Sequence, residues 1–209
     1  MLAALLPAQA SAAEIRLELT PAEARYGAAT ALRGTVADDA GAPMGGTDVA
    51  LVGRPFPYVG PFRTLATATT DDRGAYRLRR EFERNWQVKV MLGEESSPVR
   101  HAYVFPQFRL SFVARNARVI KLTQHYRVPR GVELDRPTLF YVGRRGRPTA
   151  PIAATAEVRR TGSGRFVSNA VVRIPAAWGG RFRYASCFRY TAGSGMGRPG
   201  AGCPKRFRF

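Results

Sequence analysis

Few residues of this chain have the types and spacing that enzyme catalysis requires. The 209 residues include only two histidines, His101 and His125, and a histidine acting as a general base needs a nucleophile or an acid within hydrogen-bond reach. Neither a Gly-x-Ser-x-Gly string nor a Ser, His and Asp ordering typical of hydrolases occurs in the sequence. His125 lies in a strand-like run over residues 120–128 and is interpreted as part of a sheet. The sequence therefore predicts that the protein is not an enzyme.

Two short strings match ligand-binding patterns, but turns and loops explain them better. Asp71 and Asp72 precede Gly74 and would offer oxygens to Ca²⁺, although a calcium site needs six or more converging oxygen ligands. Asp and Gly are also the residues that a hairpin turn favours. Residues 195–200 match the Gly-x-Gly-x-x-Gly string of dinucleotide sites, but they are not embedded in a strand, helix and strand unit. We therefore expect no metal and no cofactor.

The chain contains two cysteines, Cys187 and Cys203, with 15 residues between them. In an oxidising compartment such a pair predicts a disulfide that closes a Gly-rich loop, whereas in the cytosol both residues would be free thiols. The chain-entropy model gives a closed loop of this length about 3 kcal/mol of stabilisation. Zinc binding is disfavoured because the spacing is not that of a Cys-x2-Cys site.

The charge of the chain lies almost entirely in its second part. Residues 14–105 contain 12 Arg or Lys and 12 Asp or Glu, whereas residues 106–209 contain 21 Arg or Lys and three carboxylates. The second part therefore holds the whole formal charge of +18. An Arg-rich genome would explain the arginines but not why only the first part balances them. Clustered cations attract polyanions. The alternative is a solvated face that has no dedicated ligand.

Arginines in the strands and loops of the second part are the candidate contacts to a polyanion. Near the end of the chain they alternate with Phe and Tyr, which would place rings on one face of a sheet and guanidinium groups on the other. The planar, permanently charged guanidinium group suits phosphate and carboxylate groups. The candidates are Arg109, Arg144, Arg145, Arg147, Arg159, Arg160, Arg181, Arg183, Arg206 and Arg208.

Alternating apolar and polar residues predict short strands along most of the chain. Clusters of Gly, Pro and Asp separate these runs at the spacing expected of an all-β sandwich, and no window shows helical periodicity beyond two turns. The clearest predicted strands are residues 15–19, 76–82, 86–92, 108–112 and 166–174.

An internal repeat predicts two copies of the same kind of domain. The Val-Gly-Arg string of residues 52–54 recurs at 142–144, and Gly74-Ala-Tyr76 corresponds to Gly164-Arg-Phe166 at the same offset. Pro106 would end the first sheet, because proline cannot donate a hydrogen bond to a β-ladder. We therefore predict an all-β chain with two tandem sandwiches. Its parts are a signal-like segment over 1–13, a first sandwich over 14–105, and a basic sandwich with a disulfide-closed Gly-rich loop over 106–209.

The first sandwich resembles two related families of domains. Residues 19–36, with Leu-Thr-Pro, Tyr-Gly and Leu-Arg-Gly-Thr-Val in order, are similar to the opening strands of bacterial Ig-like repeats on exported proteins. Residues 34–51 and 68–76 are similar to the carboxypeptidase-regulatory-like, transthyretin-like sandwich. The resemblance implies a seven-stranded, non-catalytic domain used as a spacer, stabiliser or adhesion module. Residues 106–209 share with it only the hairpin in which a glycine precedes an aromatic residue.

Residues 1–13 resemble the end of a secretory signal peptide. A short apolar run is followed by small residues in Ala-x-Ala spacing, which predicts cleavage after Ala10 or Ala12, although no Lys or Arg precedes the run. No later segment reaches the roughly 18 apolar residues that a membrane helix needs. We expect a secreted or cell-envelope protein without a membrane span.

Two functions of different classes are consistent with the sequence. The first is a non-catalytic, exported Ig-like module that acts as a structural or adhesive spacer and contacts another envelope protein. The second is a protein that binds a polyanion, such as a cell-wall polymer, a glycan or a lipid phosphate, through its basic second domain. Nucleic acid is disfavoured as the physiological partner, because export is expected and no nucleic-acid-reading module is recognised.

Overall fold

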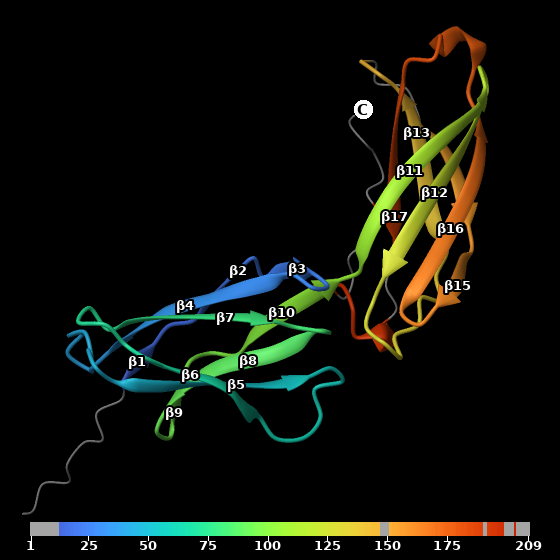
Figure 1. Ribbon diagram of the computed structural model, residues 1–209. Coiled ribbons are helices and arrows are strands. Elements are labelled where there is room, and N and C mark those ends of the chain that lie inside the picture. Colours follow the sequence, from blue (N-terminus) through green and yellow to red (C-terminus); the bar gives the residue numbers. More distant parts are fainter. Residues whose placement is uncertain (1–12, 147–150, 190–191, 199–202, 204–209) are drawn as a thin grey trace, which may run out of the picture. The chain divides into compact units, whose positions relative to one another are not determined.

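The computed structural model describes residues 13–146, 151–189, 192–198 and 203. Its regular elements in these ranges are strands and two single-turn 3-10 helices, and the described residues contain no α-helix (Figure 1). The prediction of an all-β chain is confirmed. The described part of the chain contains no helix that is long and apolar enough to cross a membrane.

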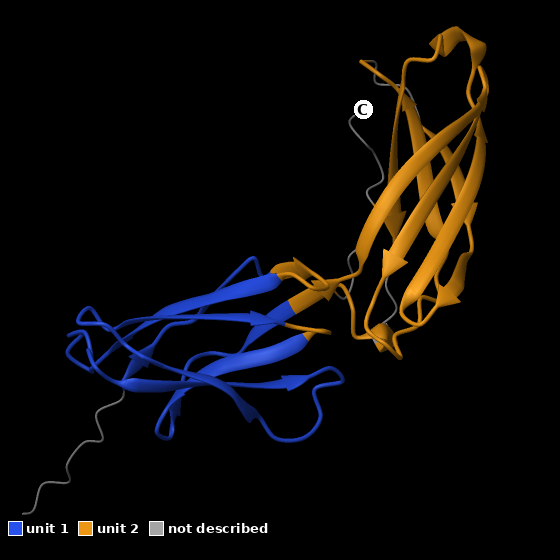
Figure 2. Cartoon of the chain, viewed as in Figure 1, with its two compact units in different colours: residues 1–22, 29–81, 86–102 blue, residues 23–28, 82–85, 103–209 orange. Residues whose placement is uncertain are grey.

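The chain packs into two compact units (Figure 2). The first unit takes its described residues from 13–22, 29–81 and 86–102. The second unit begins at residue 103 and also includes two earlier segments, residues 23–28 and 82–85. The units are therefore not two consecutive stretches of sequence.

Unit 1 contains two sheets that enclose an apolar core. In the first sheet β4 pairs with β1, β2 and β7, and in the second the order is β10, β8, β5 and β6, with β9 beside β8. Alternation along β4 and β8 buries Leu32, Val36, Val88 and Val90 completely. The strands are β1 (Glu14–Ile15), β2 (Glu18–Thr20), β4 (Ala29–Ala37), β5 (Asp48–Pro55), β6 (Arg63–Thr69), β7 (Ala75–Glu81), β8 (Trp86–Leu92), β9 (Glu95–Ser96) and the start of β10 (Arg100–Phe105).

Unit 2 contains a four-stranded sheet in the order β11, β12, β16, β15 and a three-stranded sheet in the order β14, β13, β17. Its short β3 pairs in parallel with residues 103–105 of β10, and Pro106 lies between β10 and β11. The elements are β3 (Glu23–Arg25), β11 (Gln107–Asn116), β12 (Val119–Arg127), β13 (Thr138–Arg144), β14 (Ile152–Ala156), β15 (Val158–Gly162), β16 (Arg165–Arg173), η1 (Ala176–Trp178), β17 (Phe182–Phe188) and η2 (Ala192–Ser194).

The core of unit 2 lies between these two sheets. Leu122 of β12 and Val172 of β16 meet Phe140 and Val142 of β13 there, and Trp178 of η1 packs against the same cluster. The side chains of β12 and β16 that point away from the core are exposed or partly exposed. The predicted alternation over residues 166–174 is therefore confirmed, and it leaves one face of the four-stranded sheet to solvent.

The two glycine hairpins found in the sequence have the same geometry. Gly74 in unit 1 and Gly164 in unit 2 both have a positive φ, and each carbonyl accepts a hydrogen bond of 2.9 Å from a valine N–H, that of Val36 or Val128. A Cβ on either glycine would lie 2.3 Å from the carbonyl oxygen of the same valine. Both positions therefore require glycine.

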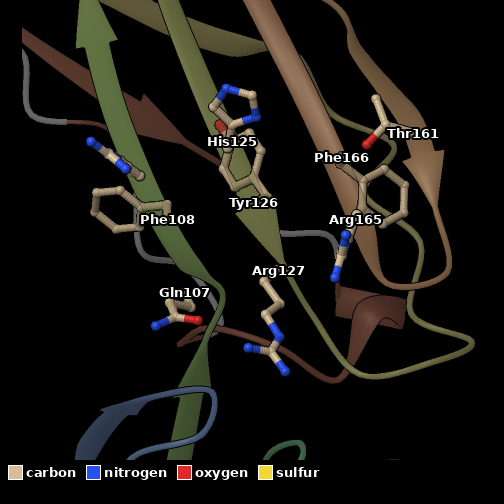
Figure 3. A pocket seen from close by; sticks show the side chains of 9 residues that line it. Gln107, Phe108, His125, Tyr126, Arg127, Thr161, Arg165 and Phe166 are labelled. Atoms are coloured by element: carbon tan, nitrogen blue, oxygen red, sulfur yellow. The ribbon is translucent and has the colours of Figure 1, made fainter.

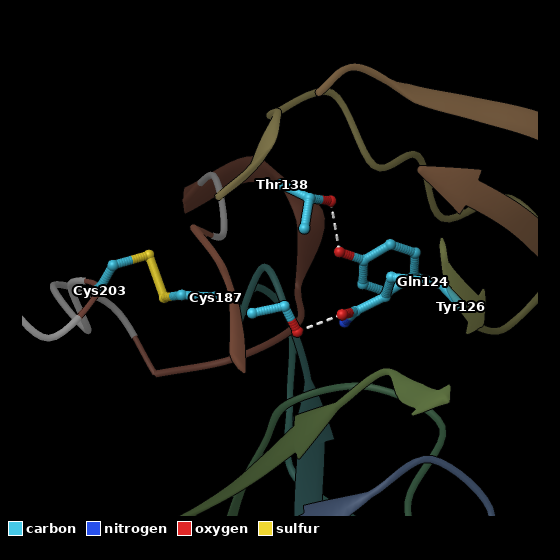
Figure 4. The surroundings of a disulfide bond; sticks show 6 residues. Gln124, Tyr126, Thr138, Cys187 and Cys203 are labelled. Carbon is cyan, nitrogen blue, oxygen red and sulfur yellow. Dashed lines mark hydrogen bonds between the residues drawn. A yellow bond between two sulfur atoms is a disulfide. The ribbon is translucent and has the colours of Figure 1, made fainter. Parts of the chain in front are cut away.

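The disulfide predicted from the sequence is present between Cys187 and Cys203 (Figure 4). The loop that it closes also bonds to the earlier segments of unit 2. Asn85 is buried and donates from its backbone N–H to Gly195 O (2.8 Å) and from Nδ2 to Gly197 O (2.7 Å). Its Oδ1 accepts from the N–H of Val104 (2.8 Å). These bonds explain why residues 82–85 pack with unit 2.

Candidate functional site

The solvent face of the four-stranded sheet in unit 2 is rich in cations, and we call it the basic face. Strand alternation decides its composition, because the apolar residues of β12 and β16 turn to the core and the intervening positions turn outward. No outward position on the four strands carries Asp or Glu. The outward basic residues are Arg109, Lys121, His125, Arg127, Arg159, Arg165 and Arg173.

The sheet register brings several of these side chains directly opposite one another. Arg127 of β12 pairs with Gln107 of β11 on one side and with Arg165 of β16 on the other. In the next outward row, His125 stands between Arg109 and Val167. Directly opposed like charges on neighbouring strands destabilise a sheet. The charges of Arg127 and Arg165 therefore do not stabilise the pairing of β12 with β16.

These two rows line a shallow hollow of about 540 Å³ (Figure 3). Figure 3 shows Gln107, Arg127 and Arg165 on three successive strands, with His125 further along β12. Every side chain of the lining is described, and no carboxylate is among them. The full lining is Gln107, Phe108, Arg109, His125, Tyr126, Arg127, Thr161, Arg165 and Phe166.

Buried polar contacts on the core side of β12 hold the hollow in place (Figure 4). The hydroxyl groups of Tyr126 and Thr138 share a hydrogen bond of 2.6 Å that links β12 to the three-stranded sheet. Ser186 donates to Gln124 and makes a second link between the sheets. Burial raises the pKa of Tyr126 above its ordinary value, while the bond to Thr138 acts in the opposite direction. Tyr126 therefore remains a neutral support beneath the cations rather than a base.

The middle of the basic face is uncharged. Ser111, Thr123 and Asn169 form its third outward row, in which Thr123 donates to Asn169 Oδ1 at 2.8 Å. Beyond them Lys121 stands between Val113 and Val171, which are 63% and 55% exposed. The face thus consists of a cationic hollow, a polar band, and a second cationic end that includes Lys121.

The arginines predicted from the sequence do not form one site. Arg109 and Arg159 lie on the basic face, although a second hollow beside Arg159 also includes Glu157. Arg160 points to the other side of β15, where it is ion-paired with Glu133 and lies over the Phe166 ring. Four further candidates belong to the three-stranded sheet or its loops: Arg144, Arg145, Arg181 and Arg183. The last three candidates, Arg147, Arg206 and Arg208, lie outside the described residues.

Sequence reasoning missed four cations of the basic face: Lys121, Arg127, Arg165 and Arg173. Each occupies an outward position of β12 or β16. The alternation of these two strands was visible in the sequence and would have placed the four residues on one side of their strands. The pairing of β12 with β16, which makes those two sides one surface, was not visible there.

The remaining chemical candidates belong to different elements of the two units. His101 lies on β10 in unit 1, whereas His125 lies on the basic face. Asp71 Oδ1 accepts from the N–H groups of Arg73 and Ala75, both at 2.9 Å, as expected for a turn. Among the described residues no cluster of His, Cys, Asp or Glu is suited to hold a metal ion.

Comparison with known proteins gives structural similarity alone. No family model and no curated protein sequence matches the chain. Among solved structures, Escherichia coli alpha-2-macroglobulin in its native conformation matches with a TM-score of 0.38 and 12% identity. Salmonella alpha-2-macroglobulin reacted with methylamine matches with a TM-score of 0.34 and 16% identity. Each match covers 86% of this chain but only 12% and 13%, respectively, of the macroglobulin chain.

Proposed function

We propose that this protein is a non-catalytic, exported β-sandwich protein that binds an anionic polymer of the cell envelope through its basic face. The observation that carries the proposal is the outward surface of β11, β12, β16 and β15, on which six Arg and Lys side chains are interleaved with no carboxylate. A sheet face of this composition concentrates positive potential and attracts polyanions from solution.

The chemistry of the cations favours oxyanions as the groups that are bound. Five of the six are arginines, whose planar forks bind phosphate and carboxylate groups through two parallel hydrogen bonds. A polymer would contact several of them at once, which compensates for the modest strength of each exposed contact.

Two features support an oxidising location outside the cytoplasm. Residues 1–13 have the composition of a signal-peptide end, and the Cys187–Cys203 disulfide is of a kind that is rare in cytosolic proteins. Mass spectrometry of secreted protein tests this part of the proposal. We expect a mature N-terminus after Ala10 or Ala12 and two fewer protons than in the dithiol. Cytoplasmic protein with free thiols would contradict it.

The binding proposal is tested with the full oxidised chain on immobilised heparin and on purified cell wall, at increasing salt concentration. Each basic residue near an anionic surface contributes about 1 kcal/mol, so R109Q/R127Q/R173Q is expected to weaken binding roughly 100-fold. The salt dependence of binding should also become shallower, because the variant makes fewer contacts with anionic groups and its binding therefore releases fewer counterions.

The matched control is R33Q/R77Q/R79Q, which removes three exposed arginines from β4 and β7 of unit 1. We expect it to change binding less than about threefold. Equal losses in the two variants would show that only net charge matters, and retention that does not depend on salt would instead favour the structural or adhesive spacer.

A further inference from the structure

We infer that the hollow at one end of the basic face is a discrete site for a phosphate group, and that the polymer carries phosphate monoester groups on hydroxylated, uncharged units. The inference rests on the proposed function and identifies the class of ligand. It depends on how donors are grouped at Gln107, Arg127 and Arg165, and on the neutral band that follows them.

The hollow gathers hydrogen-bond donors from three adjacent strands. Gln107, Arg127 and Arg165 occupy one row across β11, β12 and β16, and neighbouring strands lie about 4.8 Å apart. Arg109 stands two residues further along β11 and also lines the hollow. Three guanidinium groups and one side-chain amide can therefore reach the same small volume from different sides.

The number of these donors favours phosphate over carboxylate. Each guanidinium group offers N–H groups in a rigid fork, and one fork occupies both oxygens of a carboxylate in the bidentate arrangement. A phosphate monoester presents three unesterified oxygens and can take forks from Arg127 and Arg165 together while a further oxygen accepts from Gln107 or Arg109. The absence of a carboxylate from the lining also leaves the charge of these arginines available to the ligand.

The composition of the rest of the basic face indicates which chemical groups of the ligand adjoin the phosphate. The residues of the band, Ser111, Thr123 and Asn169, offer hydroxyl and amide groups but no charge. At the β15 edge Asn169 shares a hollow with Arg159 and Glu157, whose charges are opposite. The next cation on β12 is Lys121, six residues from Arg127 and thus about 20 Å away along the strand. A polyol or sugar unit fits the polar band. Polyphosphate or nucleic acid, with closely spaced charges, would leave negative charge against neutral groups.

The test uses the full oxidised protein and two small probes, inorganic phosphate and acetate, titrated at constant ionic strength and followed by NMR of the backbone amides and arginine Nε–H groups. Phosphate is expected to shift the signals of Gln107, His125 and Arg127, with at most weak shifts from acetate. R127Q/R165Q should weaken phosphate binding at least tenfold. The control K121Q/R173Q removes the same charge from the other end of the face and should weaken it less than threefold.

Binding to purified wall polymer measured in parallel separates the two proposals. The phosphate site would be overturned if the two double variants weakened phosphate binding equally, or if acetate bound as well as phosphate does. Salt-dependent binding of the polymer would in that case still support the proposed function. Loss of polymer binding when wall phosphates are removed, with retention when wall carboxylates are amidated, supports the inference. Absence of polymer binding at low salt would overturn both.

Discussion

The solvent faces of the two four-stranded sheets have the same construction and different charge. In unit 1, Arg33 of β4 stands opposite Glu18 of β2 and Arg77 of β7, and Glu81 lies further along the same strand as Arg77. In unit 2, the outward positions of the sheet carry basic, polar or apolar residues and no carboxylate. Alternation demands only that these positions be polar, and exposed substitutions cost little stability. The fold of unit 2 therefore does not require carboxylates to be absent from this face.

The units also differ in how their loops are held. The Asp71 turn of unit 1 is stabilised by local hydrogen bonds to Arg73 and Ala75. The loop after β17 in unit 2 is instead tied by a disulfide and by the buried side chain of Asn85. Each unit contains one of the two tryptophans, Trp86 and Trp178, so the stability of each can be followed separately.

The largest expected effect is the loss of the disulfide, which should act on unit 2 alone. C187S/C203S is expected to lower the free energy of unfolding of unit 2 by about 3 kcal/mol. Urea unfolding followed by tryptophan fluorescence measures it, with Trp178 reporting on unit 2 in a W86F background and Trp86 reporting on unit 1 in a W178F background. Equal shifts of the two transitions would show that the units unfold together.

The next effect tests what the units share. G74A and G164A are each expected to cost their own unit about 2 kcal/mol or more, because both the positive φ and the nearby carbonyl oxygen oppose a Cβ. The matched controls are G41A and G131A, which have a positive φ but nothing within 4 Å of the added Cβ. These should cost only about 1 kcal/mol. If G41A destabilised unit 1 as much as G74A, or G131A destabilised unit 2 as much as G164A, backbone strain alone would explain the loss of stability.

The smallest expected effect comes from exchanging the charge patterns of the two faces. T123E/N169E places carboxylates in the neutral band of the basic face and is expected to weaken polymer binding about tenfold, since it adds repulsion and neutralises nearby cations. The control T123Q/N169Q introduces uncharged side chains of nearly the same shape as those of T123E/N169E and should change polymer binding little. E18Q/E81Q in unit 1 should strengthen binding slightly. If the Glu and Gln variants behave alike, shape rather than charge controls the face.

The sequence predicted those features of the fold that depend on local patterns. The strands over residues 108–112 and 166–174, the turn at Asp71 and the glycine hairpins at Gly74 and Gly164 all appear as expected, although Phe108 and Phe112 are 38% and 43% exposed. The assignment of residues 23–28 and 82–85 to unit 2 did not follow from any local pattern. It depends on bonds such as that from Asn85 to Gly197, which join residues far apart in the chain.

The candidate site was predicted only in part for a similar reason. Arg109 was singled out for its strand position and lines the hollow, whereas Arg160 was singled out with Arg159 and turned out to be ion-paired with Glu133. Sequence neighbours such as these point to opposite sides of a strand. Counting basic residues along the chain cannot distinguish the two sides without the register.

The amino-acid sequence by itself determined that the chain is all β and that its excess charge follows residue 105, because these depend on residue type and on the two-residue period of a strand. It predicted the pairing of the two cysteines only for an oxidising compartment. Only the tertiary structure decided which cations share a surface. Arg127 and Arg165 become neighbours through the antiparallel register of β12 and β16, and Arg109 joins them because β11 lies on the other side of β12. The pairing of strands depends on packing between segments that are far apart in the chain. The site that this pairing creates therefore cannot be predicted from any one segment.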